Sequence, residues 1–460
     1  MRELPPRPLY HDPRAVLPGC LRPGHSNRPL TRSRPNPNMR SMSIRLRLTF
    51  LAGSTLLALL LLSGCSTGEP KTLVLWTDRP SVAPYVELYN ASQDNYRVQL
   101  EAVGDITDAF LQRGSHPDVA IGSFVNNSAA LTYFDSVQRL LDRGTVDKTL
   151  FYPGILPTGT QNGQQRLLPL SFNLPAVVFT RSSKNTDIPD FAVTLDEVRD
   201  LGAEYNESSG EHFTHMGFSP RWNREFLYVA GRTMGVNFHE TAGNGAAAAW
   251  NEDALRATLS YLDNWIRDVN QSVELENQFH TKYLYDPPYE LLMNERVRFW
   301  YESSGQYFSY SGNRRDNLDF RWITGKDRIP VLEDIVFVGM TRDSQQRRGA
   351  TDFITWLFRP DTQAQLLRVS VEDRIDGFGI AGGFSSQSDV NERFFPRYYG
   401  QTLGQIPSPD RLAFPARVPR NWNDIREDVI QPWMYGELSD PQHTDNLESM
   451  VRAWMLQKGE

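Results

Sequence analysis

The feature that most constrains the fold is an alternation of short apolar runs and amphipathic segments early in the main body of the chain. Residues 73–76 and 119–121 are short continuous apolar runs, the pattern of strands buried on both faces of a parallel sheet. Between them, residues 98–103 alternate like a strand, and residues 81–92 and 106–112 have helical spacing. This β-α-β-α-β order predicts an α/β fold built on a doubly wound parallel sheet.

Two loops of this predicted sheet are the first candidates for a ligand site. In one common strand order, 2-1-3, ligands bind at the point between the first and third strands where the order reverses. The loop after the first strand contains Trp76 and Asp78, and the loop after the third contains Phe124 and Asn126. We therefore expect these four residues at one edge of the sheet.

Later segments continue the mixture of helices and strands. Pro169 and Pro175 interrupt the apolar segment 167–179, which is therefore predicted to cross between sheets and to become a strand only over 176–179. A Thr-x-x-Glu capping box at Thr194 opens a helix. Further helices are predicted over 250–270, 347–358 and 361–369, a strand over 335–340, and irregular structure over 375–419.

The apolar run 48–62 is about 15 residues long, too short to span a membrane comfortably. Basic residues precede it and small residues follow it, which is the composition of a secretory signal. It ends Leu-Ser-Gly-Cys at Cys65, which resembles the lipobox of bacterial lipoproteins, where the cysteine is acylated with groups such as palmitate. The resemblance implies a chain anchored by lipid at the periplasmic or extracellular face of the cell envelope. The alternative is an ordinary signal peptide or membrane anchor.

The segments before and after this run are assigned from composition. Residues 1–38 are rich in Pro and Arg and have no core pattern, so we expect translation to begin at Met39 or Met42. Residues 39–64 are then the signal peptide, and 65–70 a lipidated tether. Ser66, rather than Asp, favours the outer membrane under the sorting rule of some Gram-negative bacteria.

Charge and length narrow the function classes. Without its first 64 residues the chain has 38 basic and 53 acidic residues, a net charge of about −15. Such a surface repels phosphate backbones, which argues against a nucleic-acid partner. Cys20 and Cys65 are the only cysteines, so we expect no disulfide. The roughly 400 remaining residues are too many for one hydrophobic core and predict two domains.

Five segments, in order, resemble the extracellular solute-binding proteins of ABC importers, in particular the large family that captures sugars and oligosaccharides. They are LVLWTD (73–78), GSHPDVAIG (114–122), LLPLSFNLPAVVFTRSS (167–183), TLDEVRDL (194–201) and GATDFITWLFRPDTQAQLL (349–367). Residues 179–181 and 294–300 depart from the family pattern, which leaves the fold assignment intact and the ligand class open.

This resemblance implies a type II periplasmic-binding-protein fold: two doubly wound α/β lobes joined by crossing segments, with a ligand cleft between them. We place the first lobe at 71–171 plus 330–382 and the second at 172–329 plus 383–460. The implied function is capture of a mono- or oligosaccharide and its delivery to the permease subunits of an ABC transporter. The resemblance further implies a monomer that needs no cofactor and no metal and catalyses no reaction.

Loop position and side-chain chemistry together select residues for the cleft. Aromatic faces stack on the C–H patches of sugars, and planar polar groups bind their hydroxyls. The candidates are Trp76, Asp78, Phe124, Asn126, Asn173, Trp222, Asn223, Trp300, Tyr301, Glu302, Ser303, Gly383, Phe384 and Trp422. We expect Trp76 and Trp222 to sandwich a sugar ring from opposite lobes. The alternative is that these tryptophans are core residues and that Asp78 and Glu302 are ordinary ion-pair partners.

The sequence offers less support for an enzymatic function. His212 and His215 have i, i+3 spacing but no evident third zinc ligand, and no G-x-S-x-G motif or free cysteine nucleophile follows Cys65. A glycosidase needs two carboxylates beside the scissile bond, which an acidic chain can supply anywhere. Two rivals to a transport receptor therefore stay open: a secreted lipoprotein enzyme acting on glycans, and a sensor or adhesin derived from a binding protein.

Overall fold

The structure is a computed structural model that describes residues 69–181, 187–241, 248–372, 377–440 and 442–458. The predicted upstream segment, the signal peptide and Cys65 lie outside these residues. Among the helices described, none combines the length and the apolar character needed to cross a bilayer.

The first lobe is built on a six-stranded sheet with the order β17-β6-β16-β3-β1-β2. Its strands are β1 (Lys71–Thr77), β2 (Tyr96–Ala102), β3 (Val119–Ser123), β6 (Leu168–Phe172), β16 (Val336–Met340) and β17 (Phe384–Ser385). The first three are parallel and have the predicted 2-1-3 order. β16 runs antiparallel to both β3 and β6. All residues of β3 and β16 are buried, which explains their continuous apolar sequences.

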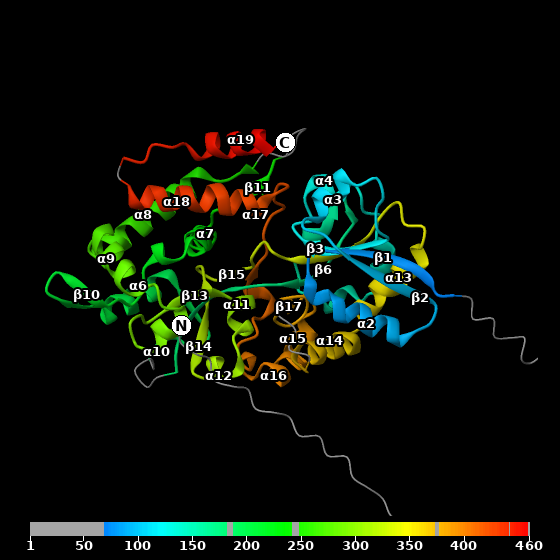
Figure 1. Cartoon of the computed structure of the whole chain (residues 1–460), viewed down its shortest axis with the longest axis horizontal. Coiled ribbons are helices and arrows are strands. Elements are labelled where there is room, and N and C mark those ends of the chain that lie inside the picture. Colours follow the sequence, from blue (N-terminus) through cyan, green and yellow to red (C-terminus); the bar gives the residue numbers. More distant parts are fainter. Residues whose placement is uncertain (1–68, 182–186, 242–247, 373–376, 441, 459–460) are drawn as a thin grey trace, which may run out of the picture. The chain divides into compact units, whose positions relative to one another are not determined.

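Helices cover this sheet where the sequence pattern predicts them (Figure 1). A 3₁₀ turn, η1 (Pro80–Val82), leads into α2 (Ala83–Ser92), which buries Tyr85, Val86 and Tyr89. The helix α3 (Ile106–Gln112) begins after Asp105, whose carboxylate accepts from the backbone N–H of Asp108. Later in the chain, α13 (Arg347–Leu357) and α14 (Pro360–Glu372) belong to the same lobe.

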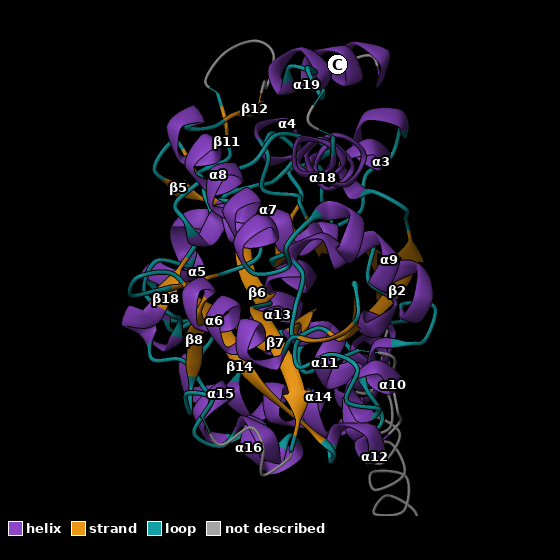
Figure 2. Ribbon diagram, turned by 90° about the vertical axis from the view of Figure 1, so that its left-hand side faces the viewer, coloured by secondary structure: helices purple, strands orange, loops and turns teal. Residues whose placement is uncertain are grey.

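The second lobe has a four-stranded mixed sheet in the order β13-β7-β14-β8. Its strands are β7 (Pro175–Thr180), β8 (Ala192–Thr194), β13 (Trp300–Ser303) and β14 (Leu318–Thr324). Along β7, Ala176 and Val178 face one core cluster, whereas Val177 and Phe179 face the other. This period of two is that of a strand with a core on each face, and Figure 2 shows β7 beside β14.

The helices of the second lobe come from two distant parts of the chain. α6 (Leu195–Tyr205) opens with the predicted capping box of Thr194 and Glu197. Figure 1 shows α17 (Trp422–Ile425), α18 (Gln431–Ser439) and α19 (Leu447–Lys458) on the same side as α7 (Arg224–Thr233) and α8 (Glu252–Asp268).

The remaining elements of the whole chain are η2 (Lys148–Leu150), η3 (Leu156–Gly159), η5 (Pro220–Trp222), η6 (Gly400–Thr402), η7 (Pro409–Arg411), the π-helical η8 (Arg426–Ile430), α4 (Ser128–Leu131), α5 (Gln138–Asp142), α9 (Val273–Tyr283), α10 (Pro288–Met293), α11 (Ser304–Ser309), α12 (Gly312–Arg315), α15 (Ser388–Arg393), α16 (Phe395–Tyr398), β4 (Thr160–Gln161), β5 (Gln164–Gln165), β9 (Glu207–Ser209), β10 (His212–His215), β11 (His239–Glu240), β12 (Ala248–Ala249), β15 (Ile329–Pro330) and β18 (Leu412–Ala413).

Three features differ from the sequence-based expectation, and one is that residues 388–393 and 395–398, expected to be irregular, form α15 and α16. Residues 168–172 form a strand inside the first sheet although Pro169 was expected to prevent one. The ladder between β6 and β16 shifts register next to Pro169, and such an irregularity accommodates a residue that has no N–H to donate. Residues 384–385 were expected in the second lobe, but they pair with β6 as β17 of the first sheet.

Asn173 lies in the segment that crosses between the sheets from β6 to β7, and its side chain binds both the segment that leads back into β16 and the loop before β17. Its Nδ2 donates to Asp334 Oδ2 over 2.9 Å and to the carbonyl oxygen of Gly382 over 3.1 Å. Its Oδ1 accepts from the hydroxyl of Ser304 over 2.7 Å, and its backbone carbonyl accepts from the N–H of Leu332. Asn173 is only 8% exposed, so water cannot readily replace these partners.

We predict that Asn173→Ala lowers the free energy of unfolding by about 3 kcal/mol, because it leaves several buried polar groups without a partner. Urea unfolding followed by fluorescence measures the change. Asn294→Ala, at an exposed position after α10, is the matched control and should stay within about 0.5 kcal/mol of the parent. Equal effects of the two substitutions would contradict a special role for Asn173.

Candidate functional site

The loops that follow β1 and β3 lie together, as the strand order predicts. Ser123 donates to Asp78 Oδ2 from its backbone N–H over 3.2 Å and from its hydroxyl over 3.3 Å. Arg79 lies 3.6 Å from Asp78 Oδ1 and donates to Ser123 Oγ over 2.6 Å. A Cβ at Gly122 would lie 2.7 Å from Asp78 Oδ1, so only glycine leaves room for this carboxylate. Burial raises the pKa of Asp78, and the charge of Arg79 partly opposes the shift.

Two further residues predicted in these loops are Phe124, which contacts the second lobe, and Asn126, whose side chain has one polar atom without a partner among the described residues. Phe124 has a left-handed φ of 56°, and its half-buried ring packs against the core cluster of the second lobe. Asn126 donates from Nδ2 to the carbonyl oxygen of Thr158 over 3.2 Å. Its buried Oδ1 accepts no hydrogen bond from any described residue. That oxygen is an acceptor available to a ligand hydroxyl.

A polar group that we call the junction cluster lies beside the Asn173 crossing. Its members are Glu225 of α7, Tyr301 and Glu302 of β13, Tyr310 after α11, Asp334 before β16 and Arg426 of η8. The charge of Arg426 lowers the pKa of Glu225, and that of Asp334 raises it. The charge of Glu225 in turn raises the pKa of Tyr301 and of Glu302. Asp334 also binds Asn173, so the cluster is continuous with the crossing segments.

Glu302 is a buried carboxyl group of this cluster whose pKa is raised. It is 9% exposed, and its Oε1 accepts a short hydrogen bond of 2.6 Å from the hydroxyl of Tyr310. Burial raises the pKa of Glu302 from 4.5 to about 7, the bond from Tyr310 partly opposes the shift, and the charge of Glu225 adds to it. Near neutral pH, Glu302 therefore exists both as a carboxylate and as a carboxylic acid.

A row of aromatic rings lies in the same lobe. Trp222 stacks on Trp300 with ring centroids 5.8 Å apart and on Phe279 with centroids 5.7 Å apart. Both tryptophans are half-buried, and Trp222 Nε1 is buried without a hydrogen-bond partner among the described residues. Trp222 was expected in a polar loop, but aromatic neighbours surround it. The row offers both apolar ring surface and an unpaired N–H, the two groups that sugar rings bind.

Four of the predicted aromatic site residues are core residues. They are Trp76, Tyr301, Phe384 and Trp422, all at most 2% exposed. Trp76 packs on Phe110 and beneath Arg113, and its Nε1 donates to Glu101. This burial removes Trp76 from the expected sandwich with Trp222, because neither ring face is open. Trp422 packs against Phe238, and Phe384 against several rings between the two sheets.

Three further predicted residues shape the backbone. Asn223 accepts from the N–H of Glu225 and caps α7. Ser303 caps α11 in a capping box with Gln306. A Cβ at Gly383 would lie 2.5 Å from the carbonyl oxygen of Phe172, so glycine is required for the close approach of these two segments. These residues position their neighbours, and a direct contact of any predicted residue with ligand stays a prediction.

Sequence reasoning missed Glu225, Tyr310, Asp334 and Arg426. Asp334 directly precedes a predicted strand, a signal that could have found it. Glu225 sits three residues after Trp222, but its helix was not predicted. Arg426 lies after the segment expected to be irregular, and nothing in the local pattern links it to residues 200 positions earlier.

Side chains of the two lobes also bind each other outside the junction cluster. The Glu240 carboxylate accepts from the hydroxyl of Ser128 over 2.6 Å and from its backbone N–H over 3.2 Å. Arg420 Nη2 donates to Asp108 Oδ1 over 2.7 Å. These bonds connect α4 and α3 of the first lobe to β11 and to the segment before α17.

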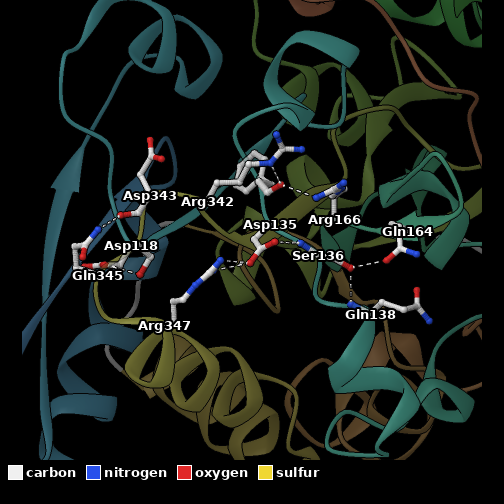
Figure 3. Close-up of polar contacts among 12 residues, drawn as sticks. Asp118, Asp135, Ser136, Gln138, Gln164, Arg166, Arg342, Asp343, Gln345 and Arg347 are labelled. Atoms are coloured by element: carbon white, nitrogen blue, oxygen red, sulfur yellow. Dashed lines mark hydrogen bonds and ion pairs between the residues drawn. The ribbon is translucent and has the colours of Figure 1, made fainter.

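A cavity of about 770 Å³ lies in the first lobe between α5 and α13. Figure 3 shows the polar side chains there: Arg347 points to Asp135, and Ser136 points to Gln164. None of the predicted site residues lines this cavity. Its labelled groups bind one another, whereas the junction cluster retains unpaired donors and acceptors, so the latter is the stronger candidate.

The histidines His212 and His215 lie on β10, where they contact Gln278 and Glu207. Within the described ranges, no group of three or more His, Cys, Asp or Glu is placed to hold a metal ion.

No protein-family model matches the chain, and no curated protein matches its sequence. Solved structures match most of its length. The sugar-binding protein MalE from Xanthomonas citri aligns with 84% of this chain and 96% of its own, with a TM-score of 0.61 and 13% identity. A cyclo/maltodextrin-binding protein complexed with maltotetraose aligns with 85% of this chain and 98% of its own, with a TM-score of 0.60 and 13% identity.

An ABC substrate-binding protein from Listeria monocytogenes, in complex with cycloalternan, aligns with 85% of this chain and 100% of its own, with a TM-score of 0.56 and 12% identity. At such identities the likeness shows the fold. The chain has the two-lobed, type II periplasmic-binding-protein fold that the sequence resemblance predicts.

The shifted pKa of Glu302 predicts a pH-dependent stability. Because this pKa rises from 4.5 in the unfolded chain to about 7 in the folded state, the folded protein holds the proton more tightly. The contribution is complete below pH 4.5 and disappears as pH rises through 7, a loss of about 3 kcal/mol. Urea unfolding at pH 5 and pH 8 measures it.

Glu302→Gln should reduce the difference in unfolding free energy between the two pH values by about 2.5 kcal/mol, the part of this loss that falls between pH 5 and pH 8. Glu204→Gln, at an exposed position on α6, is the control and should leave the difference unchanged. A pH dependence that is the same in Glu302→Gln and in the parent would show that Glu302 titrates alike in the folded and unfolded chains.

Proposed function

We propose that this protein is a lipid-anchored, extracytoplasmic solute-binding protein that captures a carbohydrate and delivers it to an ABC transporter permease. The protein carries out no chemistry on the sugar. The fold is shared with sugar-binding proteins of this class, which supports the general assignment. The anchor, the permease and the cellular location rest on the sequence resemblance around Cys65 and on the five family segments.

The observations that carry the proposal are unpaired polar groups in both lobes, one of them on Asp334 beside Asn173, and a row of partly exposed aromatic rings in the second lobe. Asp334 Oδ1 and Asn126 Oδ1 are unpaired acceptors, and Trp222 Nε1 and Arg426 Nε are unpaired donors among the described residues. A sugar hydroxyl both donates and accepts, so a polyhydroxylated ligand satisfies both kinds of group. The partly exposed Trp222 and Trp300 supply ring surface for its C–H patches.

The rival function is an enzyme that acts on glycans. Such an enzyme would use two of the junction carboxyl groups, one as an acid and one as a base or nucleophile. A binding protein returns its ligand intact. Chromatography of each sugar after prolonged incubation with the protein distinguishes the two functions, and hydrolysis that Glu302→Gln abolishes would replace our proposal with the enzyme.

We predict that a screen of mono- and oligosaccharides will reveal a sugar that raises the melting temperature, because a ligand that binds only the folded state stabilises it. For that sugar, Trp222→Ala should weaken binding by about 1–3 kcal/mol, roughly 5- to 150-fold. Isothermal titration calorimetry at a temperature where the variant is fully folded measures this loss apart from any change in stability.

Trp454→Ala is the matched control, since Trp454 is a half-buried tryptophan of α19 whose Nε1 contacts Asp428. Its affinity for the sugar should equal that of the parent. Unchanged affinity in Trp222→Ala would remove the aromatic row from the binding site. A complete absence of stabilisation by any sugar would contradict the carbohydrate assignment itself.

Cys65 provides a separate test of the anchor. Cys65→Ser should abolish acylation and processing at this position, because the serine hydroxyl is not the thiol that lipoprotein maturation modifies. Mass spectrometry of the N-terminal peptide, purified from membranes of the producing cells, measures both. An unmodified N-terminus at another position in the parent protein would contradict the anchor and leave sugar binding unaffected.

A further inference from the structure

Trp222 belongs to a turn that is too short to fix its ring by itself. The turn, η5, consists of the three residues Pro220–Trp222. Such short 3₁₀ runs have poor hydrogen-bond geometry and little stability of their own. The Trp222 ring nevertheless lies between two others, with interplanar angles of 19° to Phe279 and 17° to Trp300. Contacts outside the turn must therefore fix where this ring lies.

Arg221, the residue before Trp222, makes contacts of this kind. Its side chain is only 4% exposed, and each of its three nitrogens donates a hydrogen bond. Nη1 donates to Glu276 Oε2 over 3.0 Å, and Nη2 donates to Asn277 Oδ1 over 3.2 Å. Both acceptors belong to α9, the helix that also contains Phe279. Arg221 therefore binds the turn that contains Trp222 to the helix that contains its stacking partner.

The helix α18 binds the same guanidinium. Ser439 Oγ accepts from Nε over 3.1 Å and from Nη2 over 2.9 Å, and the hydroxyl of Tyr435 accepts from Nη2 over 3.2 Å. The ring centroid of Tyr435 lies 5.0 Å from the guanidinium carbon. A guanidinium is planar and its N–H groups point in fixed directions. The Arg221 side chain thus cannot rotate without breaking bonds to both α9 and α18.

The Arg221–Glu276 ion pair is better explained by orientation than by stability. Glu276 is 2% exposed, and its other oxygen accepts from Asn270 Nδ2 over 2.7 Å. Removing two charges from water costs free energy that their attraction only offsets, so well-packed apolar side chains of similar volume are often as stable in such a place. Apolar contacts have no preferred direction, whereas the hydrogen bonds of a guanidinium do. The pair therefore sets the geometry of this part of the lobe.

We propose that Arg221 is a positioning residue for sugar binding and that it acts through Trp222. Its bonds to α9 and α18 keep the Trp222 ring in the stack with Phe279 and Trp300, so the row presents one fixed surface to the sugar. This inference rests on the proposed function and adds a residue that sets affinity without touching the ligand. A preformed aromatic surface binds more tightly because less side-chain freedom is lost on binding.

The test replaces the whole ion pair, with Arg221→Met and Glu276→Leu in one variant. Both substitutions roughly keep side-chain volume and leave no unpaired buried charge, so the lobe should stay folded. Neither new side chain can make the directed bonds of the guanidinium. Calorimetry with the best-bound sugar of the screen should show an affinity loss of about tenfold, the cost of ordering one large side chain on binding.

A double-mutant cycle separates positioning from general damage. If Arg221 acts through Trp222, the same pair replacement in a Trp222→Ala background should change affinity by less than about twofold. An equal loss with and without the tryptophan would overturn the inference, while carbohydrate capture stands. Arg321→Met is the control, because Arg321 is a buried arginine of β14 in the same lobe that pairs with Asp319 over 3.1 Å. It should bind the sugar as the parent does.

Near-UV circular dichroism provides a readout that needs no sugar. The signal that Trp222→Ala removes from the parent spectrum belongs to the stacked Trp222 ring. The pair replacement should weaken the same signal and leave the far-UV spectrum unchanged. A signal that persists at full strength would overturn the inference.

Ser439→Ala is a second variant for the case in which the pair replacement disturbs folding. It keeps the ion pair and removes one acceptor of the guanidinium, so it should weaken both the near-UV signal and sugar affinity, the latter by about threefold. Parent values for both would overturn the inference. If no sugar stabilises even the parent protein, the proposed function fails, and the inference fails with it.

Discussion

One side-chain amide determines how the two sheets are joined. Asn173 lies where the chain first passes from the first sheet to the second, and its Nδ2 donates both to Asp334, in the segment that leads back into β16, and to Gly382, in the loop before β17. An amide suits this role because it donates twice and accepts at the same position. One of its partners, Asp334, carries its second oxygen into the junction cluster. The candidate site is therefore connected by hydrogen bonds to the segments that must bend if the lobes move.

Much of the fold could be predicted because the relevant signals are local. The short apolar runs became β1 and β3, and the Thr194 capping box opened α6 where expected. The failure at Pro169 has a physical cause: a register shift in the partner strand is a tertiary event, and it permits a proline where the strand rule forbids one. The local sequence pattern indicates the secondary structure that a segment favours. Tertiary packing determines whether a residue that disfavours it, such as Pro169 in a strand, is tolerated.

The site was less predictable than the fold. Strand order located Asp78 and the loop after β3, because sheet topology alone brings those ends together. Trp76 follows the same rule of position, yet its ring turns into the core towards Phe110, a choice that loop position does not reveal. The junction cluster combines residues from 225 to 426, and no single-sequence pattern relates positions that distant.

The order of strands in the first sheet has a consequence for how the chain becomes a folded protein. β16 lies in the middle of this sheet, between β3 and β6, yet it follows the whole 172–329 segment of the second lobe in the sequence. Ser123 of β3 can pair with Val336 of β16 only after all the residues between them have been synthesised. Until it does, the inner edge of β3 exposes unpaired backbone groups to other chains. Loop closure over such a separation slows folding, so a partly synthesised chain passes through a long interval in which it can aggregate.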